Sequence, residues 1–115
     1  MSIYRLYTGD DGQSHIEEQH PSSHPALTAS QATQPIFFRE RPRGLFSDWH
    51  NAPRRQYLIL LSGEVEIGLG DGSKHRFGAG TALLAEDTTG QGHTTLIVYG
   101  EPVIQAVIPL AETKQ

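Results

Sequence analysis

Turn-forming residues interrupt this chain at short intervals from one end to the other. The sequence has 12 glycines and 7 prolines in 115 residues, and they are spread out rather than gathered in one linker. Between them lie short runs in which apolar and polar side chains alternate, which is the pattern of a half-buried strand. We therefore expect about nine short strands, no convincing helix, and an all-β sandwich or meandering barrel with a ligand cavity.

The length of 115 residues allows one domain, because a second would have too few residues for a core of its own. We assign residues 1–34 to N-terminal strands and a polar loop, and residues 36–109 to the core of the barrel. The loop begins near residue 19 and shows no sustained period, with room for one helical turn at 26–32. Residues 111–115 are expected to form a frayed tail.

The composition excludes several kinds of chemistry and partner. The chain has no cysteine, so disulfides, thiolate metal ligands and a cysteine nucleophile are excluded. Its net charge of −4 argues against a general nucleic-acid binder. Near Met1 the sequence lacks the pattern of a signal peptide, in which a basic segment is followed by an apolar one. No apolar run approaches the length needed to span a membrane. We therefore expect a cytoplasmic protein with no nucleic-acid partner and no membrane partner.

Arginines gather within one stretch, residues 46–63, and just before it. Five of the nine basic residues lie there, namely Arg39, Arg41, Arg43, Arg54 and Arg55. One interpretation is a solvated rim along a pair of strands, because charge clusters usually lie at the surface. The other is that one or two of them, with Arg54 and Arg41 as candidates, hold an anionic small molecule, because guanidinium matches a carboxylate in a two-pronged contact.

The same stretch places polar side chains at one end of a buried run. Asp48 and His50 share one face of an expected strand, because strand side chains alternate. Pro53 breaks that strand, and Gln56 opens the apolar run 56–61. We therefore expect a functional site here, where polar groups lie at the end of a buried strand.

The spacing in this stretch resembles the first sequence motif of the cupin superfamily. Gly44 is followed by five residues and then His50, Ala52 stands where a second histidine belongs, and Gln56 occupies the glutamate position. Gly63 follows after six further residues, as the motif requires. The resemblance implies a cupin-type double-stranded β-helix, or jelly-roll, barrel over roughly residues 38–109.

A second motif of the same superfamily is matched more loosely. Gly80 begins it and His93 supplies its histidine, with Glu86 in place of a proline and two extra residues in the turn. A complete pair of motifs offers three histidines and a carboxylate, which suits iron, manganese, zinc, copper or nickel. This chain offers His50, Gln56 and His93, with Asp48 as a weaker fourth candidate. A single divalent metal and no metal at all remain open alternatives.

Without metal, the same residues still suit a site for proton transfer. We expect His50, His93 and Gln56 to meet at the mouth of a cavity lined by Leu58, Leu60, Leu83, Ile97 and Trp49. Imidazole carries protons near neutral pH. Asp87 would orient His93 as a carboxylate partner, or would instead cap its own loop in an Asx turn. Trp49 and Tyr57 would either contact a ligand or fill a core or interface.

These features support two main functions. The first is an enzyme that acts on a small, anionic organic molecule, by dioxygenase or lyase chemistry with metal, or by isomerisation or cyclisation without it. The alternative is a non-catalytic binding or sensing module, and a structural barrel that mainly dimerises is a third. Exposed strand edges and the extended N-terminal segment suggest a homodimer by sheet pairing. The cupin resemblance implies in addition that His15 or Glu17 could complete a neighbour's cavity, because the first strands of small cupins often cross to a partner subunit. His20, His24 and His75 are expected at the surface.

Overall fold

Strands make up nearly all the regular structure of the chain. The computed structural model describes residues 2–111, in which there are ten strands and one short 3₁₀ helix, η1 (Pro25–Leu27). The strands are β1 (Ile3–Thr8), β2 (Ser14–Gln19), β3 (Phe37–Arg41), β4 (Phe46–His50), β5 (Gln56–Ser62), β6 (Glu64–Gly68), β7 (Lys74–Gly78), β8 (Ala82–Ala85), β9 (His93–Ile97) and β10 (Val103–Pro109). The all-β prediction is confirmed, and the expected tail lies outside the described residues beyond 111. No helix within residues 2–111 has the length and apolar character needed to span a membrane.

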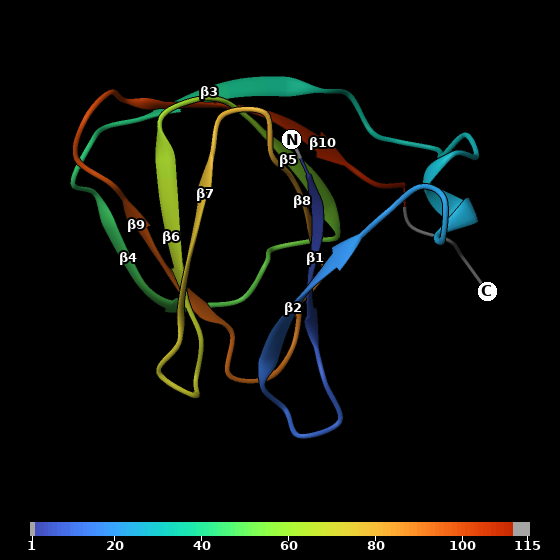
Figure 1. Cartoon of the computed structure of the whole chain (residues 1–115), viewed down its shortest axis with the longest axis horizontal. Coiled ribbons are helices and arrows are strands. Elements are labelled where there is room, and N and C mark those ends of the chain that lie inside the picture. Colours follow the sequence, from blue (N-terminus) through green and yellow to red (C-terminus); the bar gives the residue numbers. More distant parts are fainter. Residues whose placement is uncertain (1, 112–115) are drawn as a thin grey trace.

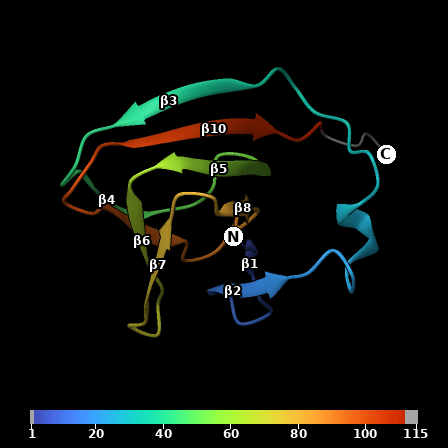
Figure 2. The same ribbon diagram turned by 45° about the horizontal axis from the view of Figure 1, so that its top comes forward.

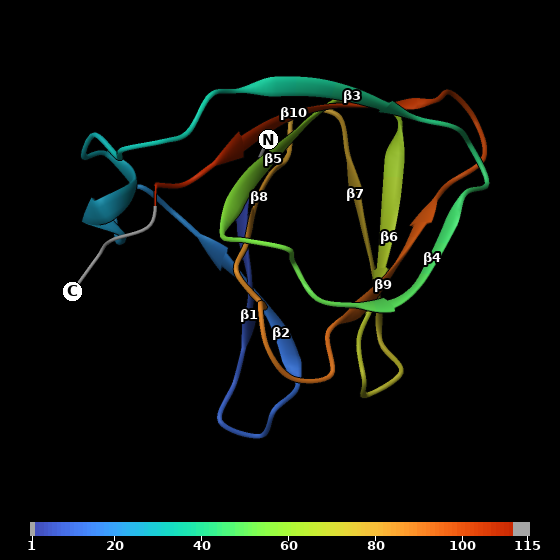
Figure 3. The same cartoon turned by 180° about the vertical axis from the view of Figure 1, so that it is seen from behind.

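The strands form two sheets that curve toward each other (Figures 1 and 3). One sheet has six strands in the order β2-β1-β8-β5-β10-β3, and the other has four in the order β4-β9-β6-β7. All neighbouring strands are antiparallel except β1 and β8. No ladder within the described residues joins the two sheets, so the barrel expected from the sequence is open at both seams. Figure 2 shows β3 as the outermost strand of the larger sheet, beside β10.

Apolar side chains from both sheets meet in the space between them. Leu60 and Val103 of the larger sheet and Val65 of the smaller are almost completely buried. Burying each such side chain contributes about 1.5 to 3 kcal/mol. Gly63 makes the tight link from β5 to β6 at a φ of +77°, where a Cβ would lie 2.7 Å from Cγ2 of Val103. The glycine that matches the first motif is therefore required by packing as well as by backbone conformation.

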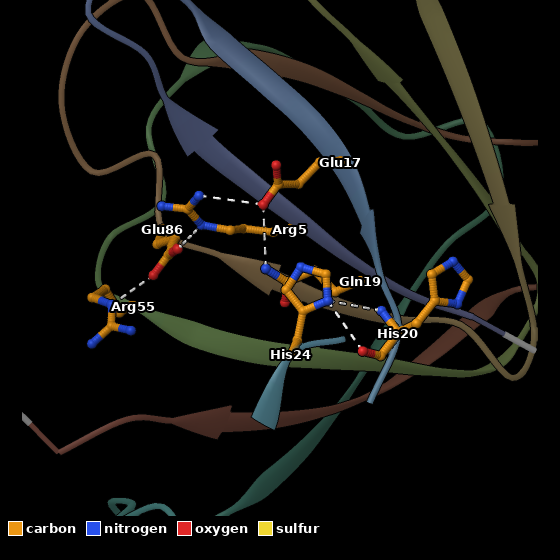
Figure 4. A network of polar contacts seen from close by, with 7 residues as sticks. All are labelled: Arg5, Glu17, Gln19, His20, His24, Arg55 and Glu86. Atoms are coloured by element: carbon orange, nitrogen blue, oxygen red, sulfur yellow. Dashed lines mark hydrogen bonds and ion pairs between the residues drawn. The ribbon is translucent and has the colours of Figure 1, made fainter. Parts of the chain in front are cut away.

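The long loop between β2 and β3 runs along the outer surface of the six-stranded sheet. Its only helix is η1, which is shorter than the helical turn expected at 26–32. Beside the loop, Glu86 pairs with Arg5 and with Arg55, whose Nε lies 2.8 Å from a Glu86 oxygen (Figure 4). Arg5 also lies 3.4 Å from Glu17 of the neighbouring strand. This network lies on the face of the sheet that points away from the smaller sheet.

Candidate functional site

A cavity of about 440 Å³ lies between the two sheets. Its volume falls within the range typical of small-molecule sites. The polar residues that line it are Arg39, Arg41, Ser47, Asp48, His50, Gln56, His93, Thr95 and Gln105, and the others are Leu6, Leu45, Ala52, Pro53, Leu58, Val65, Ile67, Leu83, Ala85 and Ile97. Residues 50, 56 and 93, which are far apart in the sequence, thus border one cavity.

His50 and His93 face each other at the ends of neighbouring strands. They are paired across the β4–β9 ladder, and their ring centroids lie 4.4 Å apart with an angle of 58° between the planes. Gly92 allows this approach, because it has a φ of +77° and a Cβ there would lie 2.2 Å from the carbonyl oxygen of His50. The residue just before His93 must therefore be glycine for the two strands to meet in this way.

A buried carboxylate fixes the orientation of His93. Asp87 is completely buried, and its Oδ2 lies 2.5 Å from Nδ1 of His93. The same oxygen accepts a hydrogen bond of 2.7 Å from the hydroxyl of Ser14. An ionised carboxylate only accepts hydrogen bonds, so Nδ1 of His93 carries the proton and Nε2 is left for the cavity. Among the described residues, Oδ1 of Asp87 has no hydrogen-bond partner.

Two alternatives were open for Asp87, namely orienting His93 or capping its own loop in an Asx turn. The carboxylate contacts Ser14 and His93, and no hydrogen bond within the described residues joins it to the backbone of its own loop. The loop is held instead by its carbonyl groups, since Nδ2 of Asn51 donates to the oxygens of Asp87, Thr89 and Gly90. Ser14 was not recognised from the sequence, because 73 residues separate it from Asp87 and nothing local marks the contact.

His50 has the same division of roles between its two nitrogens. Its Nδ1 lies 2.7 Å from the carbonyl oxygen of Asp48, so Nδ1 is the donor and Nε2 is the free acceptor. The carboxylate of Asp48 also borders the cavity, while its Oδ1 accepts a hydrogen bond from the backbone of Trp49 at 2.9 Å. The site therefore presents two imidazoles that are oriented by groups behind them.

Gln56 is held by a neighbouring cation. Its side chain is 2% exposed, and its Oε1 accepts a hydrogen bond of 2.8 Å from Nη1 of Arg54. Arg54 does not line the cavity but fixes Gln56, which does. With the oxygen engaged by a guanidinium, the amide nitrogen is the group that Gln56 offers to a ligand, and a nitrogen of this kind only donates.

Arg39 also borders the cavity, although the candidates for anion binding in the sequence are Arg54 and Arg41. Its Nε donates a hydrogen bond of 2.8 Å to Oε1 of Gln105, its cross-strand partner. Burial lowers the pKa of Arg39, and the positive charges of Arg41 and Arg54 lower it further. No carboxylate within the described residues pairs with any of these three arginines. This side of the cavity therefore has an uncompensated positive charge.

Trp49 and Tyr57, for which contact with a ligand was one of two alternatives, lie outside the cavity. Trp49, on the edge strand β4, is 44% exposed and does not line the cavity. Tyr57 lies on the outer face of the larger sheet, where its hydroxyl and Gln31 are hydrogen-bonded. Leu60, expected in the cavity wall, is instead part of the packed core.

Other residues singled out in the sequence are engaged outside the cavity. His15 lies 3.0 Å from Asp11 in the first hairpin, and His75 lies 3.0 Å from the hydroxyl of Ser73. His24 contacts the backbone of His20 in the long loop (Figure 4). Arg43 donates to the carbonyl of Gly100, and Glu17 and Arg55 belong to the outer network.

The donors around the cavity do not fit the divalent metal that the cupin resemblance implies. Within residues 2–111 no three histidine, cysteine, aspartate or glutamate side chains are grouped so that they could hold a metal ion. Ala52 lines the cavity where the motif has a histidine, and the oxygen of Gln56 already faces a cation. Asp48, whose Oδ1 accepts a hydrogen bond from the backbone of Trp49, is not grouped with the two histidines as a third ligand within the described residues. Two neutral imidazoles are too few for a site of iron, manganese, zinc, copper or nickel.

Two facing sheets that enclose a cavity define this chain as a double-stranded β-helix protein. No protein-family model and no curated protein matches the sequence. Solved structures do match. One is a conserved Klebsiella pneumoniae protein with a double-stranded β-helix domain, at 19% identity and a TM-score of 0.52 over 74% of this chain and 75% of that one.

Two further solved structures are similar. The cupin domain of Schizosaccharomyces pombe Cnp3 aligns over 97% of this chain and 83% of its own, with 12% identity and a TM-score of 0.53. The DMSP lyase DddQ of Ruegeria pomeroyi aligns over 75% of this chain at 21% identity and a TM-score of 0.54, and the alignment spans only 42% of that protein. The chain therefore has the cupin fold, as its motif spacing predicted.

Proposed function

We propose that the protein is a small enzyme that binds an organic anion between its sheets and uses His93 to move a proton. The single observation that carries this proposal is the buried Asp87–His93 pair, which leaves one imidazole nitrogen for the cavity. A neutral imidazole with a carboxylate behind it is suited to general base catalysis, because the carboxylate stabilises the imidazolium that forms.

The two sheets supply different parts of the reaction. From the larger sheet, Arg39 and Arg41 hold the anionic group and bring the substrate against the opposite wall. From the smaller sheet, Nε2 of His93 takes a proton from the carbon next to a carbonyl group. The His93 imidazolium then returns this proton from Nε2 to another atom of the substrate, which completes an isomerisation and restores the neutral ring. His50, whose ring centroid is 4.4 Å from that of His93, lies beside it with Nε2 as a hydrogen-bond acceptor. Loss of a leaving group in place of this second transfer gives the lyase variant.

Deuterium uptake by a panel of small organic acids tests this proposal. Short 2-oxo acids are incubated with the protein in D₂O, and proton NMR follows exchange at the carbon next to the oxo group. We expect at least one acid to exchange, and His93→Gln to reduce the rate about a hundredfold or more. The control is His75→Gln, outside the cavity. No uptake with any acid, or uptake that is unchanged in His93→Gln, would contradict the proposal.

A non-catalytic binding module is the second candidate. It is favoured by Ala52 and Gln56, since a methyl group and an amide held by Arg54 replace residues that the motif reserves for chemistry. Such a module would be stabilised by a bound organic acid and would melt at a higher temperature, with no deuterium uptake in the same samples. The two measurements together separate the candidates.

We also propose that the protein is a homodimer. The edge strand β3 carries Phe37 and Phe38, and Phe38 is 64% exposed. Leu61 and Ile104, on the neighbouring strands of the same sheet, are exposed as well. An edge with unpaired backbone groups and an apolar surface is suited to pairing with a second copy. Light scattering of the purified protein should give twice the chain mass, and Phe38→Lys should give the monomer.

A further inference from the structure

The cavity has two kinds of wall, and the difference between them restricts what it can hold. Its arginines, Arg39 and Arg41, both come from the edge strand β3. Much of the remaining surface is aliphatic and belongs to the core cluster, including Leu6, Val65 and Ile97. A ligand that fills this space therefore meets cationic groups on one side and hydrocarbon over most of the rest.

The geometry of Arg39 suits one anionic group. Its Nε is bound to Gln105, which fixes the plane of the guanidinium. No hydrogen bond within the described residues uses its two terminal nitrogens, and none uses the side chain of Arg41. A planar guanidinium held in this way presents a fork to a carboxylate. Binding one carboxylate would relieve the repulsion among Arg39, Arg41 and Arg54.

A second anionic group on the wall opposite β3 meets no arginine or lysine side chain, because both cavity arginines belong to β3. Asp48 is the only acidic residue among those that line it, and its charge repels an anion on the far side from β3. A carboxylate placed against Leu83, Ile67 or Ile97 would lose its hydration without gaining a hydrogen bond. An apolar body in the same position gains by leaving water.

We propose that the ligand is an organic acid with a single carboxylate and an apolar body, and that Arg39 and Arg41 bind the carboxylate. This inference rests on the proposed function and deepens it by naming the class of substrate. It also assigns Arg39 as a determinant of specificity. The carboxylate lies against β3, so the apolar body and the carbon next to the head group lie toward His50 and His93 on the facing sheet.

Three compounds with the same number of carbons test the inference by NMR titration of the full chain. Hexanoate has one carboxylate and an apolar body, adipate has a carboxylate at each end, and 1-hexanol has none. We expect hexanoate to bind about tenfold or more tightly than either of the others, because each charged contact contributes more than a tenfold change in affinity. Binding should shift the amide signals of cavity residues such as Thr95 and Ala85.

Substitutions of the two cavity arginines test whether they cause the preference for hexanoate. Arg39→Gln should weaken hexanoate binding about tenfold or more and leave 1-hexanol binding unchanged. Arg41→Gln should have an effect of the same sign and serves as the second variant if Arg39→Gln does not fold. Arg76→Gln is the matched control, because Arg76 pairs with Glu64 and Glu66 outside the cavity. Unchanged hexanoate binding in both cavity variants would overturn the inference.

The compound series separates this inference from the proposed function. Adipate binding as tightly as hexanoate would overturn the single-carboxylate inference and leave the proposal of an anion site intact. Tighter binding of 1-hexanol would overturn the assignment of Arg39 and Arg41 as carboxylate ligands. Binding of none of the three would also overturn the inference, and deuterium uptake dependent on His93 would still decide the proposed function independently.

Discussion

Nδ1 of His93 lies 2.5 Å from Oδ2 of Asp87, and both side chains are buried beside the cavity. The carboxylate has a second support in the hydroxyl of Ser14, which comes from the N-terminal hairpin. One residue from that hairpin, one from the 86–92 loop and one from β9 therefore form a single chain of hydrogen bonds. Its effect is to hold one tautomer and one orientation of the imidazole.

Asp87→Asn tests whether this carboxylate supports proton transfer. The substitution keeps the shape of the side chain but removes the negative charge that faces the imidazolium during the reaction. We expect the rate of deuterium uptake to fall about a hundredfold while the affinity for the organic acid changes little. Asp71→Asn, in the exposed β6–β7 hairpin, is the control and should have the wild-type rate. Equal losses in both variants would contradict the role of Asp87.

Gly92→Ala tests the close approach of β9 to β4. The new Cβ would lie 2.2 Å from the carbonyl oxygen of His50, so the two strands must separate. Gly72→Ala is a matched control, because Gly72 has a φ of +87° with no atom within 4 Å of the added Cβ. We expect Gly92→Ala to lower the free energy of unfolding by at least about 2 kcal/mol more than Gly72→Ala does. Urea denaturation of the two variants measures the difference, and equal losses would refute the packing argument.

Glu86→Gln tests the ion network on the outer face of the larger sheet. Burial alone would raise the pKa of Glu86, but hydrogen bonds and charge from Arg5 and Arg55 outweigh it and lower the pKa. A lowered pKa in the folded state gives stability that is fully present above the unperturbed value of 4.5 and is lost as the pH falls through the folded value.

The variant should therefore be less stable than the wild type at neutral pH, by about 1 to 2 kcal/mol. The difference should begin to shrink below the unperturbed pKa and should be lost as the pH falls through the lowered pKa of the folded state, where the wild-type carboxyl also becomes protonated. Thermal melting at neutral and at acid pH measures both quantities. A difference that stays constant between the two conditions would show that the charge of Glu86 does not contribute.

Metal analysis tests the poor fit of the cavity to a divalent ion. Protein purified without chelator and without a nickel column should contain far less than one transition-metal ion per chain, because Ala52 and Gln56 do not complete a site. The metal content should be the same in His50→Ala, and treatment with a chelator should leave the melting temperature unchanged. Stoichiometric iron, manganese, zinc, copper or nickel that is lost in His50→Ala would contradict this expectation.

The sequence predicted the framework of the site better than its details. Alternation, turn residues and motif spacing were enough to predict an all-β cupin fold, because the period of a strand and the φ of a turn glycine are local properties. The same local rules do not show which arginine of a cluster turns inward. Arg39 lines the cavity because its partner across the ladder, Gln105, faces the same side of the sheet.

Long-range contacts and irregular strands account for what sequence reasoning missed. The bond from Ser14 to Asp87 joins residues that no local pattern connects. The β4–β9 ladder shifts register between Ser47 and His50, so simple alternation does not describe which β4 side chains reach the cavity. Tyr57 directly follows the cavity residue Gln56 in β5, and adjacent strand residues point to opposite faces, so its hydroxyl contacts Gln31 on the outer face.

The nitrogen NMR spectrum of His93, in protein labelled with ¹⁵N-histidine, shows directly whether Asp87 holds the imidazole in one tautomer with Nε2 facing the ligand. We expect Nδ1 to carry the proton and Nε2 to be bare in the neutral ring, as the bond to Asp87 requires. We also expect only Nε2 to shift strongly when hexanoate is added. A proton on Nε2 in the neutral ring, or no response of Nε2 to any organic acid that binds, would show that His93 is not held for proton transfer in this way.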